Sequence, residues 1–197
     1  MHVEGLIENV SSIDPVLKSL GTALLNALSN YLLWDAKYKV GFTLHTGTEI
    51  IDLLTSLVKE PVLVVGNMAP LVRRLKEMNI SEVKVLERNP LALGGVSLPD
   101  PAIYRLVPKK GTLIVTGATL VNDTIDMVLV MAIENGYKVI LVDPTAGVHP
   151  KPLFEKGIYA VALMHPINVE EVIKIIKLGG GRWSFSRYCR HYLALKE

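Results

Sequence analysis

The sequence lacks the features of a secreted, membrane-spanning or nucleic-acid-binding protein. Its 197 residues include a single cysteine, Cys189, so no internal disulfide can form and we expect a protein of the reducing cytoplasm. No apolar run approaches the roughly 20 residues that cross a bilayer, and the first residues lack the pattern of a signal peptide. The net charge is only +2, so we expect neither nucleic acid nor membrane as a partner.

Glutamine is absent altogether, although lysine and glutamate are frequent. Thermolabile amides are rare in proteins from hot environments, so the composition predicts a thermophilic source. Half of the residues are hydrophobic, which is more than a sheet with one solvated face needs. Such a surplus is typical of parallel strands that are buried on both faces.

From Pro61 onward, short apolar runs alternate with segments of helical spacing. The runs predict strands at 62–65, 82–86, 113–115, 139–142 and 159–163. Helices are predicted between and after them, at 70–78, 102–106, 123–134, near Leu153, and at 169–178. This alternation predicts the α/β class, with a Rossmann-like parallel sheet of about five strands and helices on both faces.

The first part of the chain has a different pattern. A helix is predicted over 12–34, because Asp14-Pro15 is a typical helix start. Its leucines recur at three- and four-residue steps, which predicts one buried face formed by Leu17, Leu20, Leu24, Leu28 and Leu32. A weak strand (39–44) and a second helix (48–58) follow. We therefore expect a small α+β N-terminal unit, residues 1–59, before a Rossmann-like domain, residues 60–197.

Polar residues follow the ends of the predicted parallel strands. Ligands bind beyond the carboxyl ends of strands in such sheets, so these loops are the expected site. The candidate ligand-binding residues are Gly66, Asn67, Glu87, Arg88, Asn89, Thr116, Gly117, Thr119, Asn122, Asp143 and His165.

The first of these loops does not match a dinucleotide-binding fingerprint. Gly66 stands alone where that fingerprint has three glycines, so NAD and FAD are disfavoured as cofactors. Glu87 follows Gly66 by 21 residues, a spacing at which an acidic residue accepts ribose hydroxyls. This spacing supports a nucleoside ligand such as S-adenosylmethionine, although an ion pair of Glu87 with Arg88 explains it equally well.

The loop after the third predicted strand is the richest in hydroxyl and amide groups. Thr116 and Thr119 are expected to hydrogen-bond a ligand, while Asn122 or Asp123 is also suited to cap the following helix.

Two histidines and a carboxylate raise the possibility of a metal site. His149, His165 and Asp143 are the candidate ligands, because imidazole and carboxylate suit divalent metals. No HExxH and no paired CxxC motif is present, and unpatterned histidines are more often structural. Asp143 and His165 are also candidates for acid–base chemistry.

The C-terminal segment interleaves basic and aromatic residues, namely Arg182, Trp183, Phe185, Arg187, Tyr188 and Arg190. Such interleaving can bind single strands of nucleic acid. The interpretation we favour is that the aromatics dock on the core with the arginines in solvent, and the alternative is an exposed surface that forms a homodimer.

A set of motifs occurs in one order: Glu87-Arg88-Asn89-Pro90, Leu98-Pro99-Asp100, 116–124, Pro144-Thr145, 154–157 and 179–181. This set, over residues 61–187, resembles the domain of unknown function 364 family, which is labelled as a heavy-metal chelation family. The resemblance implies a Rossmann-like C-terminal half, an N-terminal half like the enolase N-terminal domain, and a site in the cleft between them. The chain departs from the family at Asp143-Pro144, where Gly-Pro is expected.

Residues and resemblance together predict a small-molecule-binding protein with a polar inter-domain site at the strand ends. The alternatives are a heavy-metal-binding protein, an S-adenosylmethionine-dependent transferase and a non-catalytic homo-oligomeric assembly protein. The sequence leaves open whether the protein is an enzyme.

Overall fold

A single eight-stranded sheet organises the chain in the computed structural model, which describes residues 3–38, 41–47, 50–89, 91, 97–98, 102–106 and 110–197. Its strands are β1 (Phe42–Thr46), β2 (Val62–Val65), β3 (Val83–Leu86), β4 (Ser97–Leu98), β5 (Gly111–Thr116), β6 (Tyr137–Val142), β7 (Ile158–Pro166) and β8 (Cys189–Lys196). They lie in the order β1-β8-β7-β6-β5-β2-β3-β4.

Six of these strands are parallel and reproduce the doubly wound order. The chain runs from β2 outward to β3 and β4, and then crosses to β5, β6 and β7 on the other side of β2. The predicted α/β class with a Rossmann-like sheet is therefore confirmed. In this topology the order reverses between β2 and β5, where the loops after the two strands diverge to opposite faces.

The sheet has more strands than the five or so that were predicted. The short β4 extends one edge, and β8 and β1 extend the other as an antiparallel pair. β8 was missed because its sequence places Arg190, His191 and Lys196 among apolar residues. Its centre is nevertheless buried between β7 and β1, and Tyr192, Leu193 and Ala194 are inaccessible to solvent.

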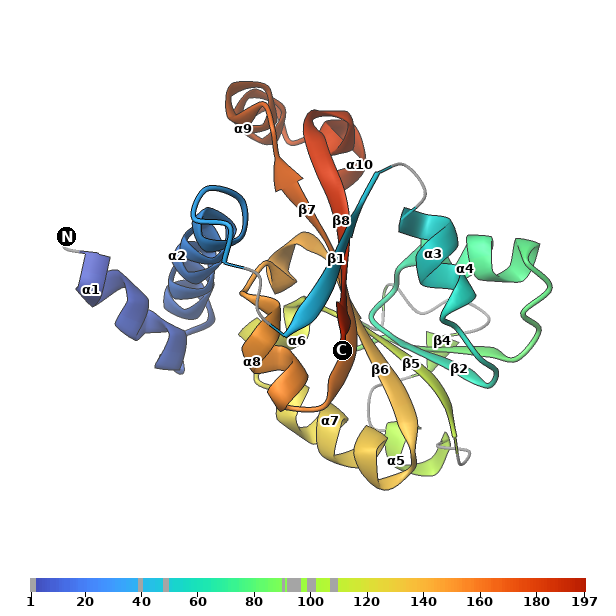
Figure 1. The fold of residues 1–197 in the computed structure, drawn as a ribbon. Helices are drawn as coiled ribbons and strands as arrows, with labels where there is room; N and C mark the ends of the chain where they lie inside the picture. Colours follow the sequence, from blue (N-terminus) through green and yellow to red (C-terminus); the bar gives the residue numbers. More distant parts are fainter. Residues whose placement is uncertain are drawn as a thin grey trace.

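Helices cover both faces of the sheet, as Figure 1 shows. On one face, α3 (Ile50–Ser56) and α4 (Ala69–Glu77) pack against the side that contains Val64, Ile114 and Ile140. On the other face, α5 (Ile103–Leu106), α7 (Ile125–Glu134) and α8 (Pro150–Glu155) pack against the side that contains Leu113, Val115 and Leu141. Neighbouring residues of one strand serve opposite cores, which explains the uninterrupted apolar runs.

The shorter elements lie at the ends of the strands. They are α6 (Ala118–Val121) after β5, the 3₁₀ turn η4 (Pro144–Ala146) after β6, and α9 (Val169–Lys177), α10 (Arg182–Phe185) and η5 (Ser186–Tyr188) between β7 and β8. No helix of the described part of the chain is long and apolar enough to cross a membrane.

The N-terminal helices α1 (Val3–Ile7) and α2 (Pro15–Trp34) lie at the side of the sheet, with the 3₁₀ turn η1 (Glu8–Ser11) between them (Figure 1). The start of α2 is as predicted, because the Asp14 side chain accepts hydrogen bonds from the amides of Val16 and Leu17. β1 follows α2 and pairs with β8, so this strand belongs to the same sheet as the C-terminal strands. The division of the chain at residue 59 stays a prediction.

The predicted burial of the α2 leucines is wrong. The buried side of this helix is formed by small and polar residues together with one leucine, namely Lys18, Gly21, Thr22, Ser29 and Leu33. Leu17, Leu20, Leu28 and Leu32 are each about two-fifths or more exposed. The regular spacing correctly placed these leucines on one face, but that face is turned away from the body of the protein.

One buried hydroxyl in β8 offers a test of the core. The Tyr192 ring is fully buried and contacts Trp34 edge-on at a centroid distance of 5.3 Å. Its hydroxyl has no hydrogen-bond partner among the described residues, and burial raises the pKa of Tyr192 well above its usual range. An unpaired buried hydroxyl costs on the order of 1 kcal/mol or more.

We therefore predict that Tyr192→Phe increases the free energy of unfolding by about 1 kcal/mol in urea denaturation. The difference should widen as the pH rises above about 10, because ionised tyrosine is accepted by the unfolded chain and not by this core. Tyr104→Phe, at a 65% exposed position, is the control and should be neutral. A Tyr192→Phe protein less stable than the parent would contradict this account.

Candidate functional site

The candidate site lies around the turn that follows β6, at the carboxyl ends of the parallel strands. α2 borders this turn on one side, through contacts with η4 and α6. The segment from α10 to the start of β8 lies beyond the ends of β6 and β7 on the other side (Figure 1). The site is thus built from elements that are far apart in the sequence.

Asp143 begins this turn in a backbone conformation that is rare for any residue with a side chain. Its φ is +107°, and its Oδ1 accepts hydrogen bonds from the Thr145 amide (3.0 Å) and hydroxyl (3.1 Å). A residue other than glycine in such a conformation costs about 1–3 kcal/mol. The glycine expected from the family resemblance would adopt it without strain, so Asp143 provides a carboxylate at an energetic cost.

Gly117, in the loop after β5, packs closely against this turn. The Gly117 amide donates to the Val142 carbonyl at 2.8 Å. A Cβ atom at this glycine would lie 2.5 Å from the Ala146 amide nitrogen, so no larger residue fits without a backbone shift. Gly117 therefore allows close packing between the loops after β5 and β6.

Asn26 ties α2 to the same turn. Its Nδ2 donates to the Thr145 carbonyl at 2.9 Å and approaches the Pro144 carbonyl at 3.5 Å. Its Oδ1 is buried and has no hydrogen-bond partner in the described part of the chain. Lys18 adds an ion pair from α2 to Asp123, in the loop after α6. Polar contacts, and few apolar ones, therefore attach α2 to the site.

His165 lies at the end of β7, against α2. Its Nδ1 is 3.0 Å from Asn30 Oδ1, and its ring stacks on Trp34 with centroids 5.2 Å apart. Burial, together with repulsion by Arg190, lowers the pKa of His165, although Asp35 opposes this effect. These effects favour the neutral ring, and Nε2 has no hydrogen-bond partner within the described ranges.

Arg182 forms the opposite border of the site. Its guanidinium lies over the Trp183 ring at 5.1 Å, and its Nε is buried without a hydrogen-bond partner among the residues described. Burial lowers the pKa of Arg182, and the carboxylate of Asp143 opposes that change. Burial and repulsion by Arg182 in turn lower the pKa of His191, whose Nε2 is 2.8 Å from the Ser186 hydroxyl.

The loops after β2 and β3 are joined by Glu87. One of its carboxylate oxygens accepts from the Asn67 amide and the other from the Asn89 amide, both at 2.8 Å. Gly66 has a φ of +95°, and a Cβ atom there would lie 2.7 Å from Thr116 Cγ2. These residues close the gap between the ends of β2 and β5. Glu87 therefore has a structural role, and Arg88 beside it is exposed.

Two further candidates are used within their own loop. Thr119 is 1% exposed and donates to the Thr116 carbonyl at 2.8 Å. Asn122 Oδ1 accepts from the Thr124 hydroxyl at 2.6 Å, and α7 begins at Ile125 with Thr124 as its N-terminal cap. Thr119 and Asn122 thus hydrogen-bond within the loop itself. The predicted cap of the following helix at Asn122 or Asp123 is wrong, because Thr124 occupies the cap position.

The metal candidates do not meet in one cluster. His149 caps α8: its Nδ1 accepts from the Lys151 amide at 3.4 Å, while its Nε2 is 3.1 Å from the Tyr38 carbonyl. The described residues, which include Asp143 and His165, contain no group of three or more His, Cys, Asp or Glu side chains that could hold a metal ion.

Arg182, Asn26 and Asn30 were missed as site residues. Arg182 follows three glycines directly, and this glycine run was the available signal for a backbone close to a ligand. The expected docking of the C-terminal aromatics is only partly correct. Phe185 and Tyr188 pack against buried residues, whereas Trp183 is 63% exposed and Arg182 is partly buried.

The chain is similar to several known proteins of one family. The model of the family described as "Putative heavy-metal chelation" (DUF364) matches residues 49–195. An uncharacterized protein of Methanocaldococcus jannaschii is 32% identical over 192 residues, which are 97% of this chain and 71% of that protein.

Two crystal structures of DUF364 proteins of unknown function are similar in fold. The protein from Pyrococcus horikoshii has a TM-score of 0.80 and 26% identity, over 97% of this chain and 74% of its own. The protein from Desulfitobacterium hafniense has a TM-score of 0.79 and 22% identity, over 100% of this chain and 76% of its own. The family model matches about three-quarters of the chain, and a curated relative is more than 30% identical to it. This chain therefore belongs to the DUF364 family.

Proposed function

We propose that this protein binds a small polar molecule with an anionic group at the carboxyl ends of β6 and β7. The observation that carries the proposal is the partly buried Arg182 guanidinium, whose Nε has no hydrogen-bond partner in the described structure. Unpaired buried donors are rare in native proteins, because each one costs about 1–3 kcal/mol. A carboxylate or phosphate oxygen would satisfy this donor through a charge-assisted hydrogen bond.

The other border of the turn supports a polar ligand with a donor group. Asn26 Oδ1 is a buried acceptor without a partner among the described residues, and it lies on the side chain that holds the turn. The neutral His165 ring has a free Nε2 on the same side of the sheet. A small molecule with a donor for α2 and an anionic group for Arg182 would use both borders. His165 and Asp143 would then be the groups available for acid–base chemistry.

An S-adenosylmethionine-like ligand has less support. The acidic residue that would accept the ribose hydroxyls is Glu87, and both of its oxygens already accept backbone amides. The space next to Gly66 is filled by Thr116. The strand ends of β6 and β7 therefore fit a ligand better than the switch point between β2 and β5.

Heavy-metal binding is the second candidate function. It rests on the family description and on the geometry of His165, whose Nδ1 faces the Asn30 side-chain oxygen. Histidine ligands of metals often donate one ring N–H to an oxygen, which directs the other nitrogen at the metal. His165 has this arrangement, whereas His149 uses both ring nitrogens within the protein.

The anion site can be tested with inorganic phosphate as the probe. We expect isothermal titration calorimetry to detect phosphate binding by the parent, and Arg182→Ala to weaken it tenfold or more, since hydrogen bonds to charged groups contribute about 1.5–3 kcal/mol. Arg187→Ala is the matched control, because the exposed Arg187 also lies over a neighbouring ring, that of Tyr188 at 4.8 Å. Equal affinities of the parent and Arg182→Ala would refute the site.

The pKa of His191 provides a second test of the anion site. It should change on phosphate binding only if the anion lies beside Arg182, and a purely structural role of Arg182 would not cause such a change. Arg182 lowers the pKa of His191 by charge repulsion, so an anion bound to Arg182 should raise that pKa. We expect an NMR titration of the His191 ring to show a higher pKa with phosphate. In Arg182→Ala the pKa should already be higher, and phosphate should not change it. Phosphate binding that leaves the pKa of His191 unchanged would place the anion elsewhere.

The metal candidate has its own test. If His165 is a ligand, protein purified without chelator or affinity metal should contain stoichiometric metal, and His165→Asn should lose it while His45→Asn, in β1, keeps it. Replacing both His149 and His165 should have the same effect as His165→Asn alone. Metal content measured by mass spectrometry that is unchanged in the double variant would exclude these histidines as ligands.

A further inference from the structure

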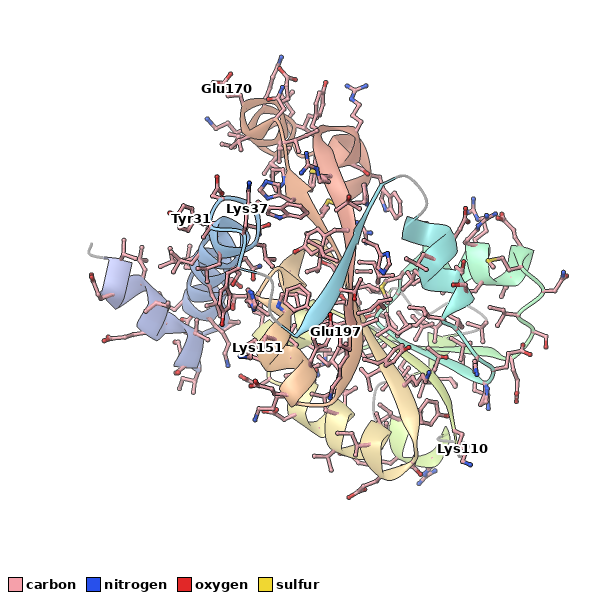
Figure 2. All side chains as sticks on the ribbon, viewed as in Figure 1. Tyr31, Lys37, Lys110, Lys151, Glu170 and Glu197 are labelled. Carbon is pink, nitrogen blue, oxygen red and sulfur yellow. The ribbon has the colours of Figure 1, made fainter. Side chains whose placement is uncertain are left out.

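The outer face of α2 is apolar and much of it is exposed, although α1 and η1 also contact this helix. It consists of Val16, Leu17, Leu20, Leu24, Leu28 and Tyr31, with Ala23 and Ala27 between them; we call this set the outer stripe. Val16 is 68% exposed, Leu20 50% and Tyr31 60%. Figure 2 shows Tyr31 on the side of the helix that points away from the sheet.

The outer stripe has the spacing of a helix-pairing seam. Leu17, Leu20, Leu24, Ala27 and Tyr31 follow one another at alternating steps of three and four residues. This is the a/d pattern with which one helix packs against another. The pattern runs over nearly the whole length of α2, so it is more than the scattered exposed leucines that every surface carries.

The same face carries no charge. From Ser19 to Trp34 the helix contains no charged residue, and its one charged side chain, Lys18, is 9% exposed and paired with Asp123. Two copies of this face can therefore meet without repulsion between like charges. A helix that lies on a membrane surface carries exposed lysine and arginine on its polar face, and α2 has only the buried Lys18 there.

We propose that the outer stripe is the contact between two copies of this chain, related by a two-fold axis. A two-fold contact requires a surface that is complementary to itself, and an uncharged a/d seam meets this condition. Together with the neighbouring Ile13 and Leu32, which are 99% and 41% exposed, the outer stripe exposes roughly several hundred Å² per copy, the same order as the about 800 Å² that each partner contributes to a standard interface. Contiguous apolar patches of this size are rare on monomers.

The contact would also brace the candidate site. The inner side of α2 carries Asn26 and Asn30, which hold the Thr145 turn and His165 by hydrogen bonds. A second copy on the outer stripe would press this helix onto the site. The inference itself is independent of the proposed ligand, because it rests on the outer side of α2 alone.

The test is the molar mass of the full chain by light scattering and analytical ultracentrifugation at micromolar concentrations. We expect the parent to have twice the chain mass of 21.7 kDa, and Leu20→Glu and Ala27→Glu to be folded monomers. Ala27 is exposed and glutamate favours helices, so this second variant leaves the fold of one copy intact. Ile176→Glu, at a 53% exposed apolar position of α9, is the control and should remain dimeric.

Other occupants of the outer stripe give different results. A monomeric parent, or a dimer that survives both glutamate substitutions, overturns the proposal. A dimer that is lost in Trp183→Ala but kept in Leu20→Glu assigns the contact to the C-terminal aromatics instead. Binding of the monomer to vesicles of anionic lipid, abolished by Leu20→Glu, would assign the face to a membrane surface and equally overturn it.

Discussion

The close approach of Gly117 to the turn after β6 is the contact on which the candidate site depends. It brings the loops after β5 and β6 together at a distance that admits no side chain, and it holds Ala146 inside the core. Within this turn Asp143 has its strained conformation, and its carboxylate accepts hydrogen bonds from Thr145. Asn26 can then reach the Thr145 carbonyl, so the position of α2 also follows from this contact.

α2 has an unusual role because its two faces are exchanged relative to an ordinary amphipathic helix. The inner face is attached to the site by hydrogen bonds and one ion pair. These contacts fix the orientation of α2 but add little to the free energy of unfolding. The outer stripe contains most of the apolar surface, which gives stability only when something covers it. Under the proposed two-fold contact, the inner face would position α2 at the site and the second copy would stabilise it from the outer side.

The sequence predicted the parallel part of the fold well, because strands buried on both faces leave uninterrupted apolar runs. It also predicted which loops meet, since the ends of parallel strands lie on one edge. It did not predict β8, where Arg190 and Lys196 interrupt the run, although the centre of that strand is fully buried. The leucine spacing in α2 defined a face and not its direction, because periodicity alone carries no information about the partner.

The roles of individual site residues were harder to predict, because they depend on contacts between distant segments. Glu87 has the sequence spacing of a ribose-binding residue, yet the loops around it place two amides within reach of its oxygens. Arg182 looked like a solvated residue of a basic segment, and only the crossing of α10 over the strand ends buries its Nε.

The charges around the strand ends bear on both of the proposed ligand classes. Arg190 lowers the pKa of His165 and Arg182 lowers that of His191, so both rings lie in a positive field. Burial is the larger cause of both lowered pKa values, and the arginine charges that add to it oppose a bound cation and attract an anion. Asp35 opposes this field at His165 and Asp143 opposes it at Arg182, and Asp143 already accepts two hydrogen bonds from Thr145 through one oxygen. Under the proposed anion-binding function, an anionic molecule, or a metal already bound in an anionic complex, would pair with the arginines, whereas a bare divalent metal would meet both arginines as well as the two carboxylates.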